Sequence, residues 1–254
     1  MSLFARLEAR LSPPPDPGRV AFLRSQPFAH RGLHGGDIAE NSRAAFEAAI
    51  RAGHGMECDV QMSEDDVPFV FHDDALDRMT GEAGTVADRS AAILDRIMLT
   101  GTDECLPRLT DVLTLIGGRA PLLIEIKAEG SHITGLCYAV RRALEGYTGK
   151  VAIMSFNPLI SGWFATHARH IVRGLVVSEE NKAGLRGRIE RTTSLWVGKP
   201  EFLAYDIRDL PSPFATRARA RGLPVLTWTV ANAAQEQVAM READQIIYEK
   251  VGNG

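Results

Sequence analysis

Four short polar clusters stand out because each lies at or near the end of an apolar run that is typical of a β-strand. They are His30-Arg31, Glu57-Cys58-Asp59, His72-Asp73 and Glu125-Ile126-Lys127. Charged side chains rarely occupy such places for packing reasons, since burying a charge costs free energy. The clusters hold three carboxylates suited to a metal ion, two imidazoles that can carry protons and two cations that can hold phosphate. This set indicates the cleavage of a phosphate ester.

The three carboxylates are the candidate metal ligands. Glu57 and Asp59 are two residues apart on a predicted strand, so their side chains share one face. Glu125 follows the apolar residues of another strand, two residues before Lys127. Oxygen ligands alone favour a hard cation, and we expect one Mg²⁺ or Ca²⁺ to bind here. The alternatives are surface salt bridges for the first two acids and an internal ion pair between Glu125 and Lys127.

His30 and His72 are the candidate catalytic acid and base, because imidazole gains and loses a proton near neutral pH. His30 is favoured as the base and His72 as the acid, although the reverse order stays open. Asp73 either orients His72 or is an ordinary turn residue. The remaining histidines fall in predicted loops or helices, where a structural role is the better interpretation. These are His34, His54, His132, His167 and His170.

Arg31 and Lys127 are the candidate phosphate contacts, Arg31 through its planar guanidinium group. Together with a divalent cation they place four positive charges against the three carboxylates. The sum is +1 when both histidines are neutral, and this matches the single negative charge of a phosphodiester.

The elements that must position these residues alternate along the chain between strand-like and helix-like segments. Continuous apolar runs are typical of parallel strands that helices cover. Eight strands are expected at 27–32, 55–62, 121–127, 151–156, 172–177, 202–207, 224–230 and 245–249. Helices are expected at 42–52, 109–116, 133–144, 159–167, 213–221 and 233–241, and the stretch 183–197 is ambiguous. This alternation predicts an α/β fold, a (β/α)8 TIM barrel.

One connection departs from the barrel pattern. A further strand-like run, 67–72, follows Met62 after only four residues, which is too short for a parallel crossover. We therefore expect an antiparallel hairpin that turns near Asp65-Asp66 and brings His72 roughly opposite Asp59. Residues 63–107 then form an insertion after the second strand.

Length, composition and charge fit one enzyme domain. The chain has 254 residues, of which 45% are hydrophobic and 24% charged, with a net charge of −3. No basic stripe points to a nucleic-acid partner, and the three cysteines are too scattered for a disulfide framework. No run is apolar enough to span a membrane, and the N-terminus has no signal-peptide core, so a cytoplasmic location is expected. A helix and linker at 1–24 precede the barrel domain at 25–254; the sequence leaves a homo-oligomer open.

The chain resembles the glycerophosphodiester phosphodiesterases in the order and spacing of its motifs. Besides the four clusters, the resemblance rests on Glu40-Asn41-Ser42, Gly55-Met56, Val60-Gln61, Leu106-Pro107, Ser155-Phe156-Asn157-Pro158 and Trp228-Thr229-Val230. It implies that Glu57, Asp59 and Glu125 bind one divalent metal, with His30 and His72 as the acid–base pair. It also implies phosphate contacts by Arg31 and Lys127 and a pocket wall of Phe156 and Trp228, for which ordinary barrel packing is the alternative. Asn41 would cap the following helix, and Glu40 would assist the metal site indirectly.

The resemblance implies a small-molecule substrate, a glycerophosphodiester cleaved to glycerol 3-phosphate and an alcohol, with water or the substrate's own 2-hydroxyl as nucleophile. The rivals are a lysophospholipase D-like enzyme for larger lipids and a barrel that binds phosphorylated metabolites without cleaving them.

The end of the sequence departs from the family pattern. We expect both the usual acidic turn after the last strand and the final helix to be absent from Gln245-Ile246-Ile247-Tyr248-Glu249-Lys250 and the residues after it. We expect the N-terminal helix, 3–11, to cover the barrel face that this would expose, either in the same chain or in a partner.

Overall fold

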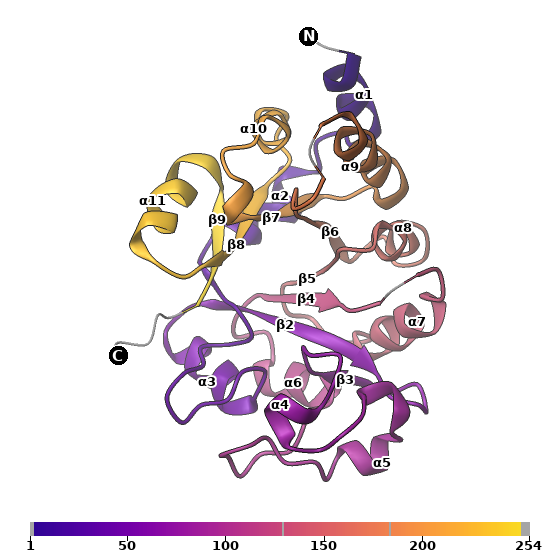
Figure 1. Cartoon of the computed structure of the whole chain (residues 1–254), viewed down its shortest axis with the longest axis vertical. Coiled ribbons are helices and arrows are strands. Elements are labelled where there is room, and N and C mark those ends of the chain that lie inside the picture. Colours follow the sequence, from indigo (N-terminus) through magenta and orange to yellow (C-terminus); the bar gives the residue numbers. More distant parts are fainter. Residues whose placement is uncertain (1–2, 129, 183, 250–254) are drawn as a thin grey trace. The chain divides into compact units, whose positions relative to one another are not determined.

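The computed structural model of the chain describes residues 3–128, 130–182 and 184–249. The chain divides into two compact units. The first unit comprises residues 28–151 together with Glu249, and the second comprises the residues up to Pro27 together with 152–248. Each unit combines parallel strands with helices (Figure 1).

Three parallel strands form the framework of the first unit. They are β1 (Phe28–Ala29), β2 (Gly55–Met62) and β4 (Leu122–Ile126), with β2 hydrogen-bonded to both of the others. The strands β1 and β4 are buried throughout, as expected for apolar runs that lie beneath helices. Gly55 is required where β1 meets β2, because a Cβ atom there would lie 2.6 Å from the Phe28 ring. The helices of this framework are α3 (Arg43–Arg51), α6 (Leu109–Ile116) and α7 (Thr134–Ala143).

The expected hairpin is present in the first unit. The strand β3 (Pro68–Val70) runs antiparallel to β2, and the turn between them contains Asp66 in the left-handed conformation, with φ of 63°. Val60 pairs with Val70, so the residue opposite Asp59 is Phe71, whose N–H donates to the Asp59 carbonyl at 3.0 Å. His72 therefore follows the residue that faces Asp59, one position from the expected register.

The segment after the hairpin folds around a small core of its own. It contains the short helices α4 (Asp77–Thr80), η2 (Val86–Asp88) and α5 (Ala91–Leu94). Their apolar side chains pack with the end of the hairpin in one buried cluster: Phe69, Phe71, Leu76, Val86, Ala91, Leu94, Ile97, Leu99 and Leu106. This packing gives the residues that follow His72 a fixed support.

Parallel strands also form the second unit, where β5 to β9 pair in the order of the chain. They are β5 (Val151–Ser155), β6 (Val172–Val177), β7 (Phe202–Asp206), β8 (Val225–Val230) and β9 (Gln245–Tyr248). The helices between them are α8 (Pro158–His167), α9 (Gly184–Gly198), α10 (Pro213–Ala220) and α11 (Ala233–Glu242), with the turn η3 (Ile207–Asp209). In the stretch that was ambiguous in the sequence, the described residues 184–197 are thus helical.

The N-terminal helix α1 (Leu3–Leu11) lies against α9. Its Glu8 is buried and accepts hydrogen bonds from Nε and Nη2 of Arg217 on α10, both at 2.7 Å. The segment beside the last strand is instead α2 (Pro17–Val20) with η1 (Ala21–Arg24), where Gln245 donates to the Arg24 carbonyl at 3.3 Å. The expectation that α1 covers the face beside the last strand is wrong for the same chain, because the buried carboxylate of Glu8 holds α1 on α10.

Within the described residues, β1, β2 and β4 to β9 alternate with helices in the pattern of a (β/α)8 barrel. The predicted fold class is confirmed. In such barrels the chemistry lies at the carboxyl ends of the strands, and the polar clusters of the first unit occupy these ends. No helix in the described part of the chain is both long and apolar enough to cross a bilayer. The expected absence of a final helix after the last strand concerns residues 250–254, which lie outside the described residues.

Candidate active site

Three buried carboxylates converge in the first unit. One oxygen from each of Glu57, Asp59 and Glu125 lies within 4.8 Å of the other two. Asp59 and Glu125 are register partners on β2 and β4, and Glu57 lies two residues before Asp59 on the same face. Glu57 and Asp59 are each only 1% exposed. The strands alone therefore bring together the three acids that the sequence singled out.

The electrostatics of these acids call for a further positive charge. Burial, and then the charge of Asp59, raise the pKa of Glu57 to about 8. The same two causes raise the pKa of Glu125. Burial also raises the pKa of Asp59, but Lys127 and other cationic side chains outweigh it, so the net pKa is lowered. Near neutral pH the protein alone thus favours a proton on Glu57 while Asp59 is ionised.

Glu57 carries the observation that tests whether a metal ion fits. Its Oε2 accepts a hydrogen bond from the Arg31 backbone N–H at 3.0 Å. Its Oε1 is buried and has no hydrogen-bond partner among the described residues. An unsatisfied carboxylate oxygen in a buried site is costly. A divalent cation would satisfy this oxygen and replace the proton, so the three acids fit a hard cation, and their oxygen ligands suit Mg²⁺ and Ca²⁺ alike.

Two cationic side chains border the carboxylates. Lys127 Nζ lies 3.2 Å from Asp59 Oδ1 and 2.9 Å from Glu125 Oε1. Arg31 Nε lies 3.4 Å from the other oxygen of Asp59, Oδ2. Both side chains are partly exposed, so they can also reach a bound anion. The structure therefore brings both predicted phosphate contacts to the acids.

The backbone at Arg31 is shaped to present its N–H to Glu57. Arg31 has a φ of 54°, and Gly32 follows with a φ of 77°. A Cβ atom on Gly32 would lie 2.7 Å from the Cβ of Ala45, so only glycine allows this close approach to α3. The left-handed conformation of Arg31 is unusual for a residue other than glycine, which is typical of a functional loop.

Asn41 has a different role from the expected one. The residue that caps α3 is Ser42, whose hydroxyl accepts from the Ala45 N–H at 3.1 Å. Asn41, with a φ of 56°, instead donates through Nδ2 to Asp59 Oδ2 at 3.1 Å. The expectation that Asn41 caps the helix is wrong, because the chain turns one residue later and directs the amide to the buried acid.

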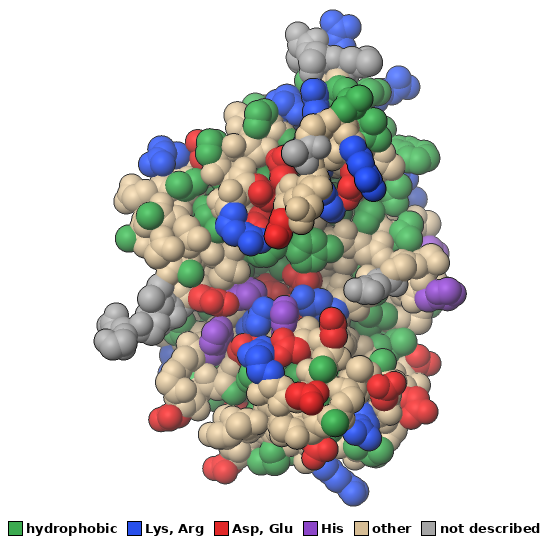
Figure 2. Space-filling model, in the orientation of Figure 1, with side chains coloured by type: hydrophobic (Ala, Val, Ile, Leu, Met, Phe, Trp, Pro, Cys, Tyr) green, Lys and Arg blue, Asp and Glu red, His purple; other side chains and the backbone are tan. Residues whose placement is uncertain are grey.

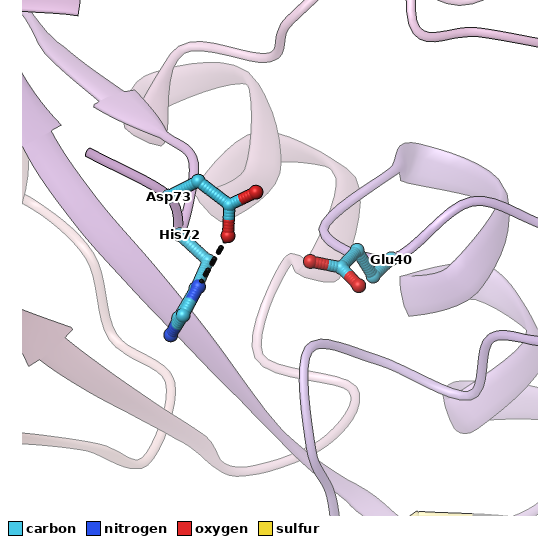
Figure 3. Close-up of side chains that lie close together, drawn as sticks. All are labelled: Glu40, His72 and Asp73. Atoms are coloured by element: carbon cyan, nitrogen blue, oxygen red, sulfur yellow. Dashed lines mark hydrogen bonds and ion pairs between the residues drawn. The ribbon is translucent and has the colours of Figure 1, made fainter. Parts of the chain in front are cut away.

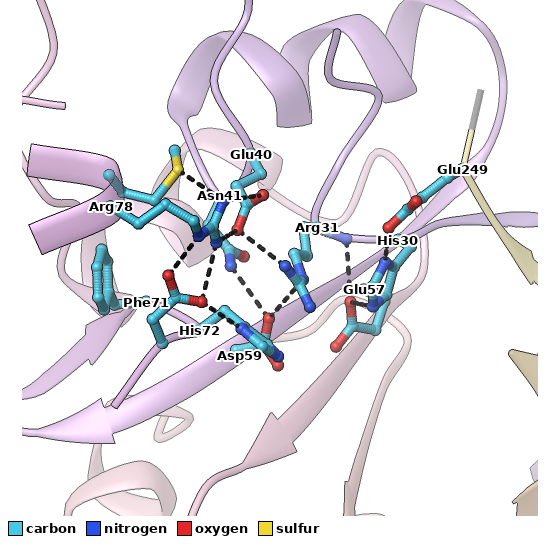
Figure 4. Close-up of polar contacts among 12 residues, drawn as sticks. His30, Arg31, Glu40, Asn41, Glu57, Asp59, Phe71, His72, Arg78 and Glu249 are labelled. Carbon is cyan, nitrogen blue, oxygen red and sulfur yellow. Dashed lines mark hydrogen bonds and ion pairs between the residues drawn. The ribbon is translucent and has the colours of Figure 1, made fainter. Parts of the chain in front are cut away.

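His30 lies beside the carboxylates and has an acidic partner that the sequence analysis missed. Its Nε2 is 3.9 Å from Glu57 Oε2, and its Nδ1 is 2.6 Å from Glu249 Oε1 (Figure 4). Burial lowers the pKa of His30, but the hydrogen bond to Glu249 and the charge of Glu57 outweigh it, so the net pKa is raised. The chain therefore does have an acid after its last strand, and the expectation that this acid is absent is wrong. Its signal was the position of Glu249 directly after the run 245–248.

His72 belongs to a second polar cluster. Its Nδ1 lies 2.8 Å from Asp73 Oδ1, which leaves Nε2 as the atom that can meet a substrate (Figure 3). Burial lowers the pKa of His72, and the charge of Asp59 and the hydrogen bond to Asp73 only partly oppose it. Of the two roles proposed for Asp73, orientation of His72 is the one that this contact supports.

Glu40, His72 and Asp73 also offer atoms within 4.8 Å of one another, as a metal site would. A cation already lies among them, however. Arg78 of α4 donates to Asp73 Oδ2 at 2.5 Å and to Glu40 Oε1 at 2.6 Å (Figure 4). Glu40 also accepts from Arg31 Nη1 at 2.9 Å. This network positions His72 and Arg31, and its acids are already neutralised.

Phe156 and Trp228, the predicted pocket wall, both belong to the second unit. Their rings meet edge to face with centroids 5.5 Å apart. Phe156 is exposed, and Trp228 donates through Nε1 to the Ala204 carbonyl at 2.9 Å. The two side chains thus form one aromatic pair with an accessible ring.

Known proteins resemble this chain in sequence and in fold. Residues 30–252 match the model of the glycerophosphoryl diester phosphodiesterase family. A glycerophosphodiester phosphodiesterase of Bacillus altitudinis is 33% identical over 142 residues, which cover 51% of this chain and 57% of the relative. One from Caldanaerobacter subterraneus is 34% identical over 145 residues, which cover 53% and 59%. The chain therefore spans less than two thirds of the length of these relatives.

Among solved structures, a phosphodiesterase of Oleispira antarctica in complex with the product sn-glycerol-3-phosphate aligns with a TM-score of 0.78. The two share 24% sequence identity, and the alignment covers 89% of this chain and 93% of the other, so this likeness bears on the fold. The family model, in contrast, matches most of the sequence. The chain belongs to the glycerophosphoryl diester phosphodiesterase family.

Proposed function

We propose that the chain is a phosphoric diester hydrolase that cleaves glycerophosphodiesters to glycerol 3-phosphate and an alcohol and depends on one divalent cation. The observation that carries the proposal is the convergence of Glu57, Asp59 and Glu125 in a buried site bordered by Lys127 and Arg31. The activity named for the relatives supports it, as does the glycerol 3-phosphate bound by the Oleispira enzyme.

Charge balance supports a phosphodiester as the substrate. The three carboxylates, a divalent cation and the two cationic side chains sum to +1, opposite to the single charge of a diester. A bound cation would polarise the phosphoryl oxygens and offset the negative charge that develops on them. Arg31 and Lys127 then hold the remaining phosphate oxygens, Arg31 through its planar fork and Lys127 as a point charge.

Proton transfer falls to the two histidines. His30 holds its proton more strongly, because the hydrogen bond that its Nδ1 donates to Glu249 raises its pKa and does not involve a metal carboxylate. His72 has a lowered pKa and an Nε2 atom free to accept a proton. We therefore assign His72 as the base that deprotonates the nucleophile and His30 as the acid that protonates the leaving alcohol. This assignment reverses the order that the sequence favoured.

Phe156 and Trp228 are proposed to contact the substrate. An exposed aromatic ring at the carboxyl end of a barrel strand offers an apolar wall for the glycerol or alcohol part of a diester. Replacing Phe156 with alanine should raise KM more than it lowers kcat, since the ring touches no group that changes charge.

The test is turnover by the full chain after chelation and after resupply of Mg²⁺ or Ca²⁺. Glycerophosphocholine and lysophosphatidylcholine are compared as substrates, and the products are identified. We expect cation-dependent release of glycerol 3-phosphate and choline from the first substrate. Preference for lysophosphatidylcholine would instead indicate a lysophospholipase D, and cation-dependent binding without cleavage would indicate a binding protein. Glu125→Gln should abolish the turnover that the cation restores. Glu236→Gln, at an exposed position on α11, is the matched control and should keep it.

A further inference from the structure

The helix α9 presents an apolar stripe to solvent. Leu185, Ile189 and Trp196 are 62%, 50% and 61% exposed. Their spacing of four and seven residues places them on one face of the helix. Another face of α9, which includes Gly187, Arg191 and Leu195, is buried against the rest of the second unit. Single exposed apolar residues are common, but three large ones in line on one helix are typical of a surface that meets an apolar phase.

The helix α1 extends this surface. The Arg188 guanidinium group of α9 lies 4.3 Å from the centroid of the Phe4 ring of α1. Seven residues further along α1, Leu11 lines the same pocket as Trp196. The two helices therefore run side by side in the same direction, and Leu7 adds another exposed apolar side chain. We call this surface, formed by α1 and α9, the α1/α9 face.

The α1/α9 face is positively charged. Its arginines have exposed side chains, and none forms an ion pair with an acid in the described part of the chain: Arg6, Arg10, Arg186 and Arg188. The chain as a whole has a net charge of −3, so this positive charge is local. Figure 2 shows hydrophobic and basic side chains interleaved over these two helices.

The acids of the two helices do not offset this charge. Glu8 is buried and bound to Arg217, and Arg221 lies 3.5 Å from the same carboxylate. Glu190 lies 2.6 Å from Lys182. Each acid is therefore paired with a base that is not among the four arginines. These acids thus leave the positive charge of the four arginines at the surface.

Charge decides which partner fits the face. A second copy of the chain would bring four arginines against four arginines, and like charges disfavour that contact. A lipid surface requires no matching shape. Aliphatic side chains with a tryptophan, flanked by arginines, are the pattern of helices that lie in the interface of an anionic bilayer.

We propose that the α1/α9 face docks the enzyme on anionic lipid membranes, with Leu185, Ile189 and Trp196 in the interface and the arginines on lipid head groups. The docking is peripheral, since no described helix is suited to span a bilayer. This inference goes beyond the proposed function and does not depend on it.

Co-sedimentation of the full chain with vesicles tests the proposal. Vesicles of phosphatidylcholine alone are compared with vesicles that also contain phosphatidylglycerol, at low and high salt. Leu185→Ser, Ile189→Ser and Trp196→Ser are combined in one variant, and Arg6→Gln, Arg10→Gln and Arg186→Gln in a second. Met240→Ser on α11, where the side chain is 72% exposed, is the matched apolar control. Circular dichroism checks that each variant is folded.

We expect binding to the anionic vesicles, little binding to phosphatidylcholine, and weakening by salt. The first variant should bind at least roughly tenfold more weakly, because it loses large apolar side chains. The second should lose about fivefold for each charge removed. Met240→Ser should bind like the parent chain. No binding to anionic vesicles, or equal binding by the first variant, would overturn the proposal. So would a dimer in solution that the first variant abolishes while no vesicle binding is seen.

Discussion

Glu57→Gln should stabilise the metal-free protein. The carboxylate is buried, one of its oxygens has no hydrogen-bond donor among the described residues, and its pKa is raised to about 8. A change of pKa from 4.5 to about 8 corresponds to about 5 kcal/mol of unfolding free energy. Glutamine has the same shape, keeps an oxygen to accept the hydrogen bond from Arg31, and carries no charge.

The pH dependence of this effect has a definite sign. Because the pKa of Glu57 is higher in the folded than in the unfolded chain, the folded chain binds more protons between pH 4.5 and 8. The contribution of Glu57 to stability is therefore highest below pH 4.5 and falls as the pH rises through 8. Glu57→Gln should match the parent chain near pH 4.5. It should be more stable by about 3 kcal/mol at pH 7 and by up to about 5 kcal/mol above pH 8.

The assay is urea unfolding in the presence of a chelator, followed by circular dichroism across this pH range. For a chain of this size each kcal/mol also raises the melting temperature by about 2–4 °C. At saturating Mg²⁺ or Ca²⁺ the parent chain should instead be the more stable of the two, because it binds the ion with three charged carboxylates and the variant with two. Glu236→Gln, at an exposed position, should show no difference that depends on pH. A Glu57→Gln variant less stable than the parent chain at every pH would refute this reasoning.

Three further predictions concern turnover. His30→Ala and His72→Ala should each slow hydrolysis of glycerophosphocholine about a hundredfold or more. A nitrophenol leaving group needs no acid, so with such a substrate His30→Ala should slow turnover only slightly, whereas His72→Ala should still slow it strongly. If each variant were slowed equally on the two substrates, the assignment would be contradicted. Glu249→Gln replaces the carboxylate that accepts from His30 with a neutral amide, which favours the protonated imidazole less, so the pKa of His30 should fall and the alkaline limit of turnover should move to lower pH. An unchanged pH–rate profile would speak against this role. Lys127→Met should lower kcat/KM about a hundredfold, with partial recovery in Lys127→Arg, and a near-normal value would exclude a phosphate contact.

The strands and helices of the fold could be predicted because each has a pattern in the local sequence. Apolar runs define the strands, and the strand period of two places Glu57 and Asp59 on one face. The four residues after Met62 exclude a parallel crossover, so the hairpin followed from chain length alone. The exact register did not, because a turn can differ by one residue, and Phe71 rather than His72 faces Asp59.

The contacts that orient the site could not be predicted, because they join residues far apart in the chain. Glu249 meets His30 across 219 positions, and nothing local to either residue signals the contact. Arg78 falls within the insertion predicted at 63–107, yet it holds two acids of the site. The turn at Asn41 depends on a left-handed residue that a capping pattern does not reveal.

The most direct test of the central claim is a cation titration of the metal-stripped chain, with bound cation and release of glycerol 3-phosphate from glycerophosphocholine measured together. We predict that turnover is absent in the stripped chain, rises in proportion to bound Mg²⁺ or Ca²⁺, and reaches its maximum at one ion per chain. Asp59→Asn should bind no ion at the same concentrations and should remain inactive. Full turnover in the stripped chain, or release of glycerol and phosphocholine in place of glycerol 3-phosphate and choline, would contradict the account.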